Sequence, residues 1–226
     1  MSRQAFIETV GPLAVQLRLE GSPIFPSVRV AQTLQETGGV IHPLNNLVGY
    51  KCGSGLPNAY WKGACIQLRT WEVYENQTEY GNDLFRVYET VEDGLRDQDL
   101  LFRSARYDRV RSALTPERQA EALRESGYAT DPNYANAIIA LIRQYQLNKY
   151  DEEVEQMQET IRQLREQVAA LQSRVLLLEQ QASMKTPEWA QAAVEKALAG
   201  GIIDTPEDGS FDFYRFLTVL DRKGLL

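Results

Sequence analysis

The chain has 226 residues and a formal net charge of −7, which is enough for one well-packed domain and additional segments. Its 43% hydrophobic and 24% charged residues are typical of a globular protein, so disorder of the whole chain is excluded. No cluster of basic residues is present, and nucleic acid is therefore not expected as a partner. No apolar stretch approaches the roughly 20 residues of a membrane span.

The few cysteine and histidine residues limit the chemistry of the chain. Cys52 and Cys65 can form one bridge or remain two free thiols, and both alternatives are open. With His42 they show no ligand spacing of a metal site, and no Gly-rich phosphate loop is present. We expect neither a metal nor a cofactor. Residues 1–8 lack a signal-peptide pattern, so we expect synthesis in the cytoplasm and release by another protein.

Residues 1–150 are predicted to be mostly helical. The first helix carries apolar residues at helical spacing, namely Phe6, Val10, Leu13 and Leu17. A second helix is predicted from an N-cap at Ser27 to the Gly38-Gly39 pair, which ends helices readily. A loop rich in Gly, Asn and Pro follows, as far as about Gly63.

One small β lobe interrupts the helices. Strand-forming residues between Cys65 and Tyr88 predict a β-hairpin with its turn at residues 80–83, which read Tyr-Gly-Asn-Asp. Helical periodicity returns at Val91–Phe102. Two more helices are predicted, one after an N-cap at Thr115 and one after an N-cap at Asp131.

Residues 151–183 carry a heptad repeat without Gly or Pro. Its a positions are Val154, Ile161, Val168 and Val175, and its d positions are Met157, Leu164, Leu171 and Leu178. The pattern predicts a coiled coil and a homo-oligomer, and the alternative is one amphipathic helix packed on residues 1–150. β-Branched a residues with Leu at d favour a dimer, whereas Arg174 at g with Glu179 at e resembles a known signature of three-stranded coiled coils and favours a parallel trimer.

Residues 184–226 predict a small helical module. One helix follows Pro187 and ends at Gly200-Gly201, and a second carries Phe213, Phe216, Leu217 and Leu220. The module is too short to be very stable alone. Its sequence resembles short repeats of surface-layer-type modules and of some phage lysin tails, which implies attachment to the cell wall. A cap on an oligomer is the alternative.

Glu36 is the strongest candidate for a catalytic group. It follows a largely apolar helical stretch and precedes the Gly38-Gly39 pair, where a carboxyl can be partly buried. Burial raises a carboxyl pKa, and a raised pKa keeps a proton available for a leaving oxygen. On composition alone, a surface glutamate is the simpler interpretation.

Four motifs resemble a known family of enzymes. They read V-A-Q-T-L-Q-E-T at residues 30–37, N-N-L-V-G-Y-K at 45–51, F-R-V-Y-E-T-V-E-D-G-L at 85–95 and G-Y-A-T-D-P-N-Y at 127–134. In this order they resemble the glucosaminidase family that includes flagellar peptidoglycan hydrolases and autolysins, glycoside hydrolase family seventy-three. The sequence departs from that family after Glu36, where a Gly-Trp-Gly stretch is usual.

The resemblance implies an α+β, mostly helical, lysozyme-like domain over residues 1–150 that hydrolyses the β-1,4 bond after N-acetylglucosamine in peptidoglycan. It implies Glu36 as the acid. The second carboxylate of the family commonly lies in a T-x-E stretch of the β lobe, which makes Glu72 the base candidate and Glu75 the reserve. Inverting, retaining and substrate-assisted routes all stay open.

Further site residues are expected on the same basis. Tyr128 would point its hydroxyl into the cleft and steady the reacting sugar, with core packing as the alternative. Asn46 would contact the substrate or hold its loop. Tyr60 and Trp61 could stack on sugar rings or pack the loop, and Tyr134 is expected to bind substrate or, more readily, to pack in the core.

Two kinds of function fit these patterns. The first is a phage endolysin or related wall hydrolase, clustered by residues 151–183, that reaches peptidoglycan after release through a holin. The second is an assembly or adaptor protein with an inactive glycan-binding domain. A muramidase that cleaves the other glycosidic bond is a further alternative.

Overall fold

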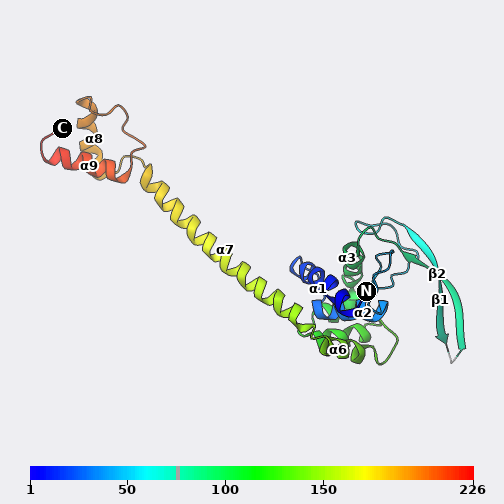
Figure 1. Cartoon of the computed structure of the whole chain (residues 1–226). Helices are drawn as coiled ribbons and strands as arrows, with labels where there is room; N and C mark the ends of the chain where they lie inside the picture. Colours follow the sequence, from blue (N-terminus) through cyan, green and yellow to red (C-terminus); the bar gives the residue numbers. More distant parts are fainter. Residues whose placement is uncertain (75–76) are drawn as a thin grey trace. The chain divides into compact units, whose positions relative to one another are not determined.

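The computed structural model describes the backbone of residues 1–74 and 77–226, and side chains outside residues 69–82. The chain divides into two compact units, Met1–Gln158 and Glu159–Leu226. The first unit is mostly helical with one two-stranded sheet (Figure 1), which confirms the predicted fold class. Among the described residues, no helix is both long and apolar enough to cross a membrane.

Helix α2 (Pro26–Thr37) lies at the centre of the first unit. Every residue from Ser27 to Leu34 is buried, which is typical of a helix that is covered by protein on all sides. The helices that pack against it are α1 (Arg3–Leu19), α5 (Pro116–Glu125) and α6 (Tyr134–Gln144). Because α2 is enclosed, only its C-terminal turn reaches the surface.

Both ends of α2 have a clear physical cause. The predicted N-cap at Ser27 is wrong, since the helix begins at Pro26 after Phe25, and proline suits the first helical position because its missing N–H needs no partner there. The Ser27 N–H donates instead to Asp151 Oδ1 at 3.0 Å. The helix stops before Gly38, whose φ of 64° is left-handed, as predicted.

The sheet is an antiparallel hairpin of β1 (Cys65–Tyr74) and β2 (Gln77–Arg86). Its register runs from Cys65 opposite Arg86 to Tyr74 opposite Gln77. The predicted turn at residues 80–83 is therefore wrong, because these residues pair with residues 68–71 inside the ribbon. Gly and Asn weaken a strand but do not end it when cross-strand pairing continues on both sides.

The remaining helices of the first unit follow the predicted pattern with one shift. Helix α3 (Val91–Phe102) has the predicted bounds, and the predicted cap of α5 is present, since Thr115 Oγ1 accepts from the Arg118 N–H at 3.2 Å. Helix α6 begins later than predicted, after Asn133 rather than Asp131. The short elements are η1 (Ala105–Tyr107) and α4 (Asp108–Arg111).

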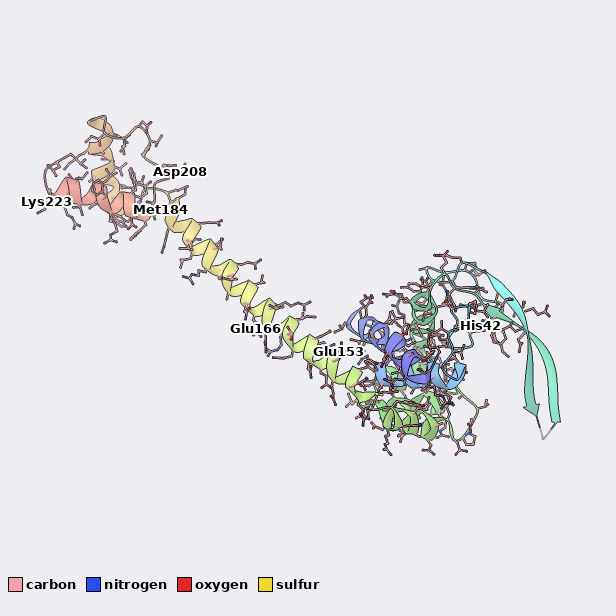
Figure 2. All side chains as sticks on the ribbon, viewed as in Figure 1. His42, Glu153, Glu166, Met184, Asp208 and Lys223 are labelled. Atoms are coloured by element: carbon pink, nitrogen blue, oxygen red, sulfur yellow. A yellow bond between two sulfur atoms is a disulfide. The ribbon has the colours of Figure 1, made fainter. Side chains whose placement is uncertain are left out.

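Helix α7 (Asn148–Ala182) starts in the first unit and continues into the second. Its first turns are fixed by Tyr150, whose hydroxyl donates to the Ile7 carbonyl at 3.1 Å. From Ile161 to Leu178 the heptad a and d side chains are 41–60% exposed. Figure 2 shows side chains around this part of the helix, including the labelled Glu166.

The second unit has its own small core. After α7 come η2 (Glu188–Ala190), α8 (Gln191–Ala199) and α9 (Phe211–Arg222). Tyr214 is fully buried, and its hydroxyl lies within hydrogen-bond distance of the carbonyl oxygens of Met184 and Pro206. The other buried residues of this core are Ala190, Ala193, Val194, Ala197 and Leu217.

Candidate active site

Glu36 lies in the last turn of α2, at the edge of a cavity of about 230 Å³. A methyl group added at Gly49 would lie 3.9 Å from Glu36 Oε2, so the backbone of residues 45–51 passes close to this carboxyl. The cavity lies between the end of α2, the following loop and the hairpin, and its other lining residues are Thr37, Val40, His42, Leu44, Asn46, Leu68 and Phe85.

The environment of Glu36 changes its protonation. The side chain is exposed, but protein replaces part of the water around its carboxyl, and this burial raises the pKa of Glu36. The group therefore keeps its proton to higher pH than an ordinary glutamate, as a general acid requires. Its openness to solvent leaves room for a ligand to approach.

Tyr128 is partly buried and is not among the residues that line the cavity. Its hydroxyl accepts a hydrogen bond from Gln98 Nε2 at 2.9 Å. Burial raises the pKa of Tyr128, and the negative charge of Glu36 raises it further. The pKa of Tyr128 therefore depends on the charge of Glu36 as well as on burial.

Tyr134 lies behind Tyr128 in the core. It is 2% exposed, and its hydroxyl accepts from Gln32 Nε2 at 2.7 Å. The ring centroids of the two tyrosines are 6.0 Å apart. Gln32 is one helical turn before Glu36, so one face of α2 carries both the candidate acid and the support of this aromatic pair.

Asn46 holds its own loop together. Its Nδ2 donates to the carbonyls of Tyr50 and Arg86 at 2.9 and 3.0 Å, and its Oδ1 accepts from the Tyr50 N–H at 2.9 Å. Three bonds to backbone fix the loop against the end of β2. Asn46 also lines the cavity, so a bound molecule would meet a side chain that is already fixed.

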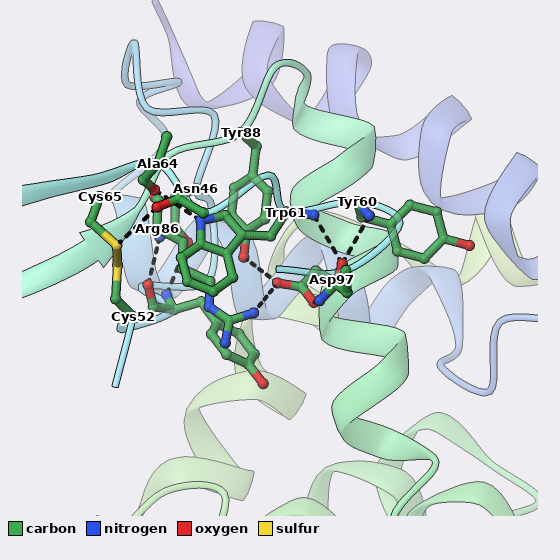
Figure 3. A network of polar contacts seen from close by, with 12 residues as sticks. Asn46, Cys52, Tyr60, Trp61, Ala64, Cys65, Arg86, Tyr88 and Asp97 are labelled. Atoms are coloured by element: carbon green, nitrogen blue, oxygen red, sulfur yellow. Dashed lines mark hydrogen bonds and ion pairs between the residues drawn. A yellow bond between two sulfur atoms is a disulfide. The ribbon is translucent and has the colours of Figure 1, made fainter. Parts of the chain in front are cut away.

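Trp61 belongs to a second polar network, shown in Figure 3, rather than to the cavity. It is 3% exposed, and its Nε1 donates to the Ala64 carbonyl at 2.8 Å. The Arg86 guanidinium lies between the rings of Trp61 and Tyr50, at 4.1 and 4.2 Å from their centroids. Asp97 pairs with Arg86 at 2.5 Å.

The same network fixes the remaining part of the 52–64 loop. Asp97 also accepts from the Tyr88 hydroxyl and from Asn58 Nδ2, both at 2.7 Å. Asn58 Oδ1 in turn accepts from the Tyr60 N–H at 2.8 Å, and the Tyr60 side chain is partly exposed. These contacts assign Trp61 to loop packing.

A disulfide links Cys52 to Cys65. This decides between the bridge and the free thiols that the sequence left open. The bridge joins the loop after the 45–51 motif to the first residue of β1. It therefore anchors the start of the hairpin next to the 45–51 segment, in which Asn46 and Gly49 line the cavity.

The comparison with known proteins decides the family. Residues 13–147 match the glucosaminidase family, described as mannosyl-glycoprotein endo-beta-N-acetylglucosaminidase. This chain belongs to the glucosaminidase family. The matched range contains all four sequence motifs and the whole cavity.

Relatives of this chain include, by name, an exo-glucosaminidase and a peptidoglycan hydrolase. The exo-glucosaminidase LytG of Bacillus subtilis is 31% identical over 160 residues, which cover 66% of this chain and 54% of LytG. The peptidoglycan hydrolase FlgJ of Salmonella typhimurium is 38% identical over 114 residues, which cover 50% of this chain and 34% of FlgJ. This chain thus spans about half of the length of LytG and about a third of the length of FlgJ.

Solved structures share the fold of the first unit. The catalytic domain of the autolysin Auto from Listeria monocytogenes has a TM-score of 0.56 at 26% identity, over 66% of this chain and 86% of that one. A C-terminally truncated glycoside hydrolase domain of Salmonella typhimurium FlgJ has a TM-score of 0.51 at 30% identity, over 64% and 98%. By title, one neighbour is the catalytic domain of an autolysin and the other is a glycoside hydrolase domain.

Two predicted site residues, Glu72 and Glu75, have side chains outside the described part of the structure. Glu72 lies in β1, where its backbone is opposite Glu79, but its side chain is not among those described. Glu75 lies outside the described residues. No group of three or more metal-binding side chains occurs in the described part of the chain.

Sequence reasoning missed Arg29 and Gln98, which lie behind the site. Arg29 is fully buried at the centre of α2, and Gln98 is fully buried in α3. The signal was an arginine between the apolar residues Val28 and Val30 of a helix, because a charge in a buried position needs a partner. The identity of that partner depends on a helix that is about 70 residues away in the sequence.

Proposed function

We propose that this chain is a peptidoglycan hydrolase that cleaves the β-1,4 bond after N-acetylglucosamine in glycan strands. The observation that carries the proposal is the Glu36 carboxyl, whose pKa is raised by burial at the edge of an open cavity. Membership of the glucosaminidase family and the names of LytG and FlgJ support the substrate class.

In this proposal Glu36 donates its proton to the leaving glycosidic oxygen. Tyr128 steadies the reacting sugar through its hydroxyl, and Asn46 keeps the cavity loop in place. The second carboxylate is proposed at Glu72, with Glu75 as the alternative. If the acetamido oxygen of the sugar is the nucleophile, Glu72 contributes less to the rate.

We also propose a division into residues 1–150 for catalysis, 151–183 for oligomerisation and 184–226 for contact with the wall. The exposed heptad side chains from Ile161 to Leu178 support a coiled coil, and Arg174 with Glu179 favours a parallel trimer over a dimer. Clustering would make wall binding multivalent. Release through a holin stays a prediction from the sequence.

The test is Glu36→Gln on purified peptidoglycan. The wild-type chain is expected to clear the suspension, and Glu36→Gln is expected to lose at least about 100-fold in rate, since general acids contribute 10²–10⁴-fold. Equal clearing by both would remove Glu36 as the acid. Clearing by neither would favour the inactive adaptor.

Mass analysis of the new reducing ends identifies the bond. An N-acetylglucosamine end supports the proposal, and an N-acetylmuramic acid end supports the muramidase alternative. A probable N-acetylmuramidase of Lactococcus lactis is 25% identical over 157 residues, but the match of residues 13–147 to the glucosaminidase family favours the N-acetylglucosamine end.

A further inference from the structure

A buried charged group lies behind the candidate site. The Arg29 side chain is fully buried, and its Nη2 pairs with Asp99 Oδ1 and donates to Ser22 Oγ at 2.8 Å. Its Nη1 donates to the Leu95 carbonyl at 3.2 Å and to Gln98 Oε1 at 3.0 Å. Arginine stays protonated in proteins, so it acts only as a donor.

This arrangement determines the orientation of the Gln98 amide. Because Arg29 can only donate, the carbonyl oxygen of Gln98 must face it, and the NH₂ group faces the other way. There Nε2 donates to the Tyr128 hydroxyl at 2.9 Å. A hydroxyl that accepts from an amide has its own hydrogen free for another acceptor. The Tyr128 ring lies 6.0 Å from the ring of Tyr134, which Gln32 binds one helical turn before Glu36, so the hydroxyl belongs to the same end of α2 as the candidate acid.

We propose that Gln98 is a positioning residue: held by Arg29, it keeps the Tyr128 hydroxyl as an acceptor, so that the phenolic hydrogen points toward an oxygen of the sugar bound beside Glu36. The inference rests on the proposed function for its substrate. It goes further by naming the side chains that set the direction of the tyrosine hydrogen. None of the four sequence motifs contains Arg29 or Gln98.

The decisive variant is Gln98→Glu, which is nearly isosteric but has no donor. Its carboxylate would accept from Arg29 and also from the Tyr128 hydroxyl, which turns the phenolic hydrogen away from the substrate. We expect kcat on peptidoglycan fragments to fall on the order of 100-fold with KM changed less than about twofold, because a single fixed donor contributes about 10²–10³-fold.

The matched control is Gln119→Glu. Gln119 is also fully buried, and it bonds to the Phe25 N–H and to the carbonyls of Pro23 and Val110, outside the cavity. We expect a lower unfolding midpoint and unchanged kcat. If Gln98→Glu does not fold, Gln98→Met replaces it, since it removes the donor without adding charge, and the same loss of kcat is expected.

A double-variant cycle separates positioning from a general structural effect. Tyr128→Phe should lower kcat as much as Gln98→Glu, and the combined variant should lower it no further. Independent, multiplied losses would overturn the proposal. So would a fall in kcat for Gln119→Glu that equals the fall for Gln98→Glu.

A second readout does not depend on activity. In protein labelled with ¹³C at tyrosine Cζ, the Tyr128 resonance is assigned by its loss in Tyr128→Phe. We expect Gln98→Glu to move it and Gln119→Glu to leave it in place. A resonance that does not move overturns the positioning role. A resonance that moves in a chain without hydrolase activity keeps that role and removes the proposed function.

Discussion

At the residue scale, the candidate site is built around one enclosed helix. Residues 27–34 of α2 are buried on all faces, and Glu36 is in the turn where the helix leaves the core. Its carboxyl therefore loses part of its surrounding water although the residue is at the surface. Gln32, one turn earlier, fixes Tyr134 beneath Tyr128.

This placement predicts the pH dependence of hydrolysis. A general acid works when protonated, and burial raises the pKa of Glu36 above the usual 4.5. The rate should therefore fall as pH rises through a pKa above 4.5, and remain high below it until another group titrates. The measurement is kcat/KM against pH on soluble glycan fragments. An alkaline limb at or below 4.5 would contradict the assignment of Glu36.

At the element scale, Asp151 joins the start of α7 to the start of α2. Its Oδ1 accepts from the Ser27 N–H, while its Oδ2 is buried without a hydrogen-bond partner. Burial raises the pKa of Asp151 from 3.8 to about 6, against smaller opposing effects of Ser27 and Arg18. The contact contributes more to folding when the carboxyl is neutral.

Stability should therefore depend on the charge of Asp151. Its folded pKa is above its unfolded pKa, so its contribution is complete below about pH 3.8 and is lost as pH rises through about 6. The difference corresponds to about 3 kcal/mol of unfolding free energy. Urea unfolding at pH 4 and pH 7 measures the change in unfolding free energy. This change should be smaller in Asp151→Asn than in the wild type. The control Glu152→Gln, at an exposed neighbour, should show the same change as the wild type.

The Cys52–Cys65 bridge is the second link between elements. It closes a short loop, with 13 residues of sequence separation, and such a cross-link contributes about 3 kcal/mol by restricting the unfolded chain. We expect Cys52→Ser/Cys65→Ser to lower the unfolding free energy by 2–3 kcal/mol, roughly. Urea unfolding with and without reductant tests this. A double variant that still responds to reductant would point to another cause.

At the scale of the whole molecule, α7 carries an apolar seam that its own chain leaves exposed from Ile161 to Leu178. If the seam pairs with other copies, Leu164→Glu/Leu171→Glu should give monomers in light scattering, because charges cannot be buried there without partners. Ser173→Glu, at heptad position f, should keep the oligomer. A wild-type monomer at micromolar concentration would exclude the coiled coil.

The sequence by itself determined most elements, the family and the candidate acid. Helix α3, the cap of α5 and the end of α2 follow from local chemistry, namely periodicity, a capping threonine and a left-handed glycine. The predictions of the hairpin turn and of the start of α2 were wrong, because strand register and the contacts that enclose α2 override local turn and cap preferences.

Only the tertiary structure decided what surrounds the acid. Three contacts show this: the Cys52–Cys65 bridge, the packing of Trp61 against Arg86, and the hydrogen bonds from Arg29 through Gln98 to Tyr128. In the sequence, the two cysteines could equally be free thiols, and the other partners are far apart. Buried polar groups must find partners, but which partner each one finds depends on how the helices pack. A motif can therefore name Glu36 and Tyr128, whereas only the packed core shows how Tyr128 is held.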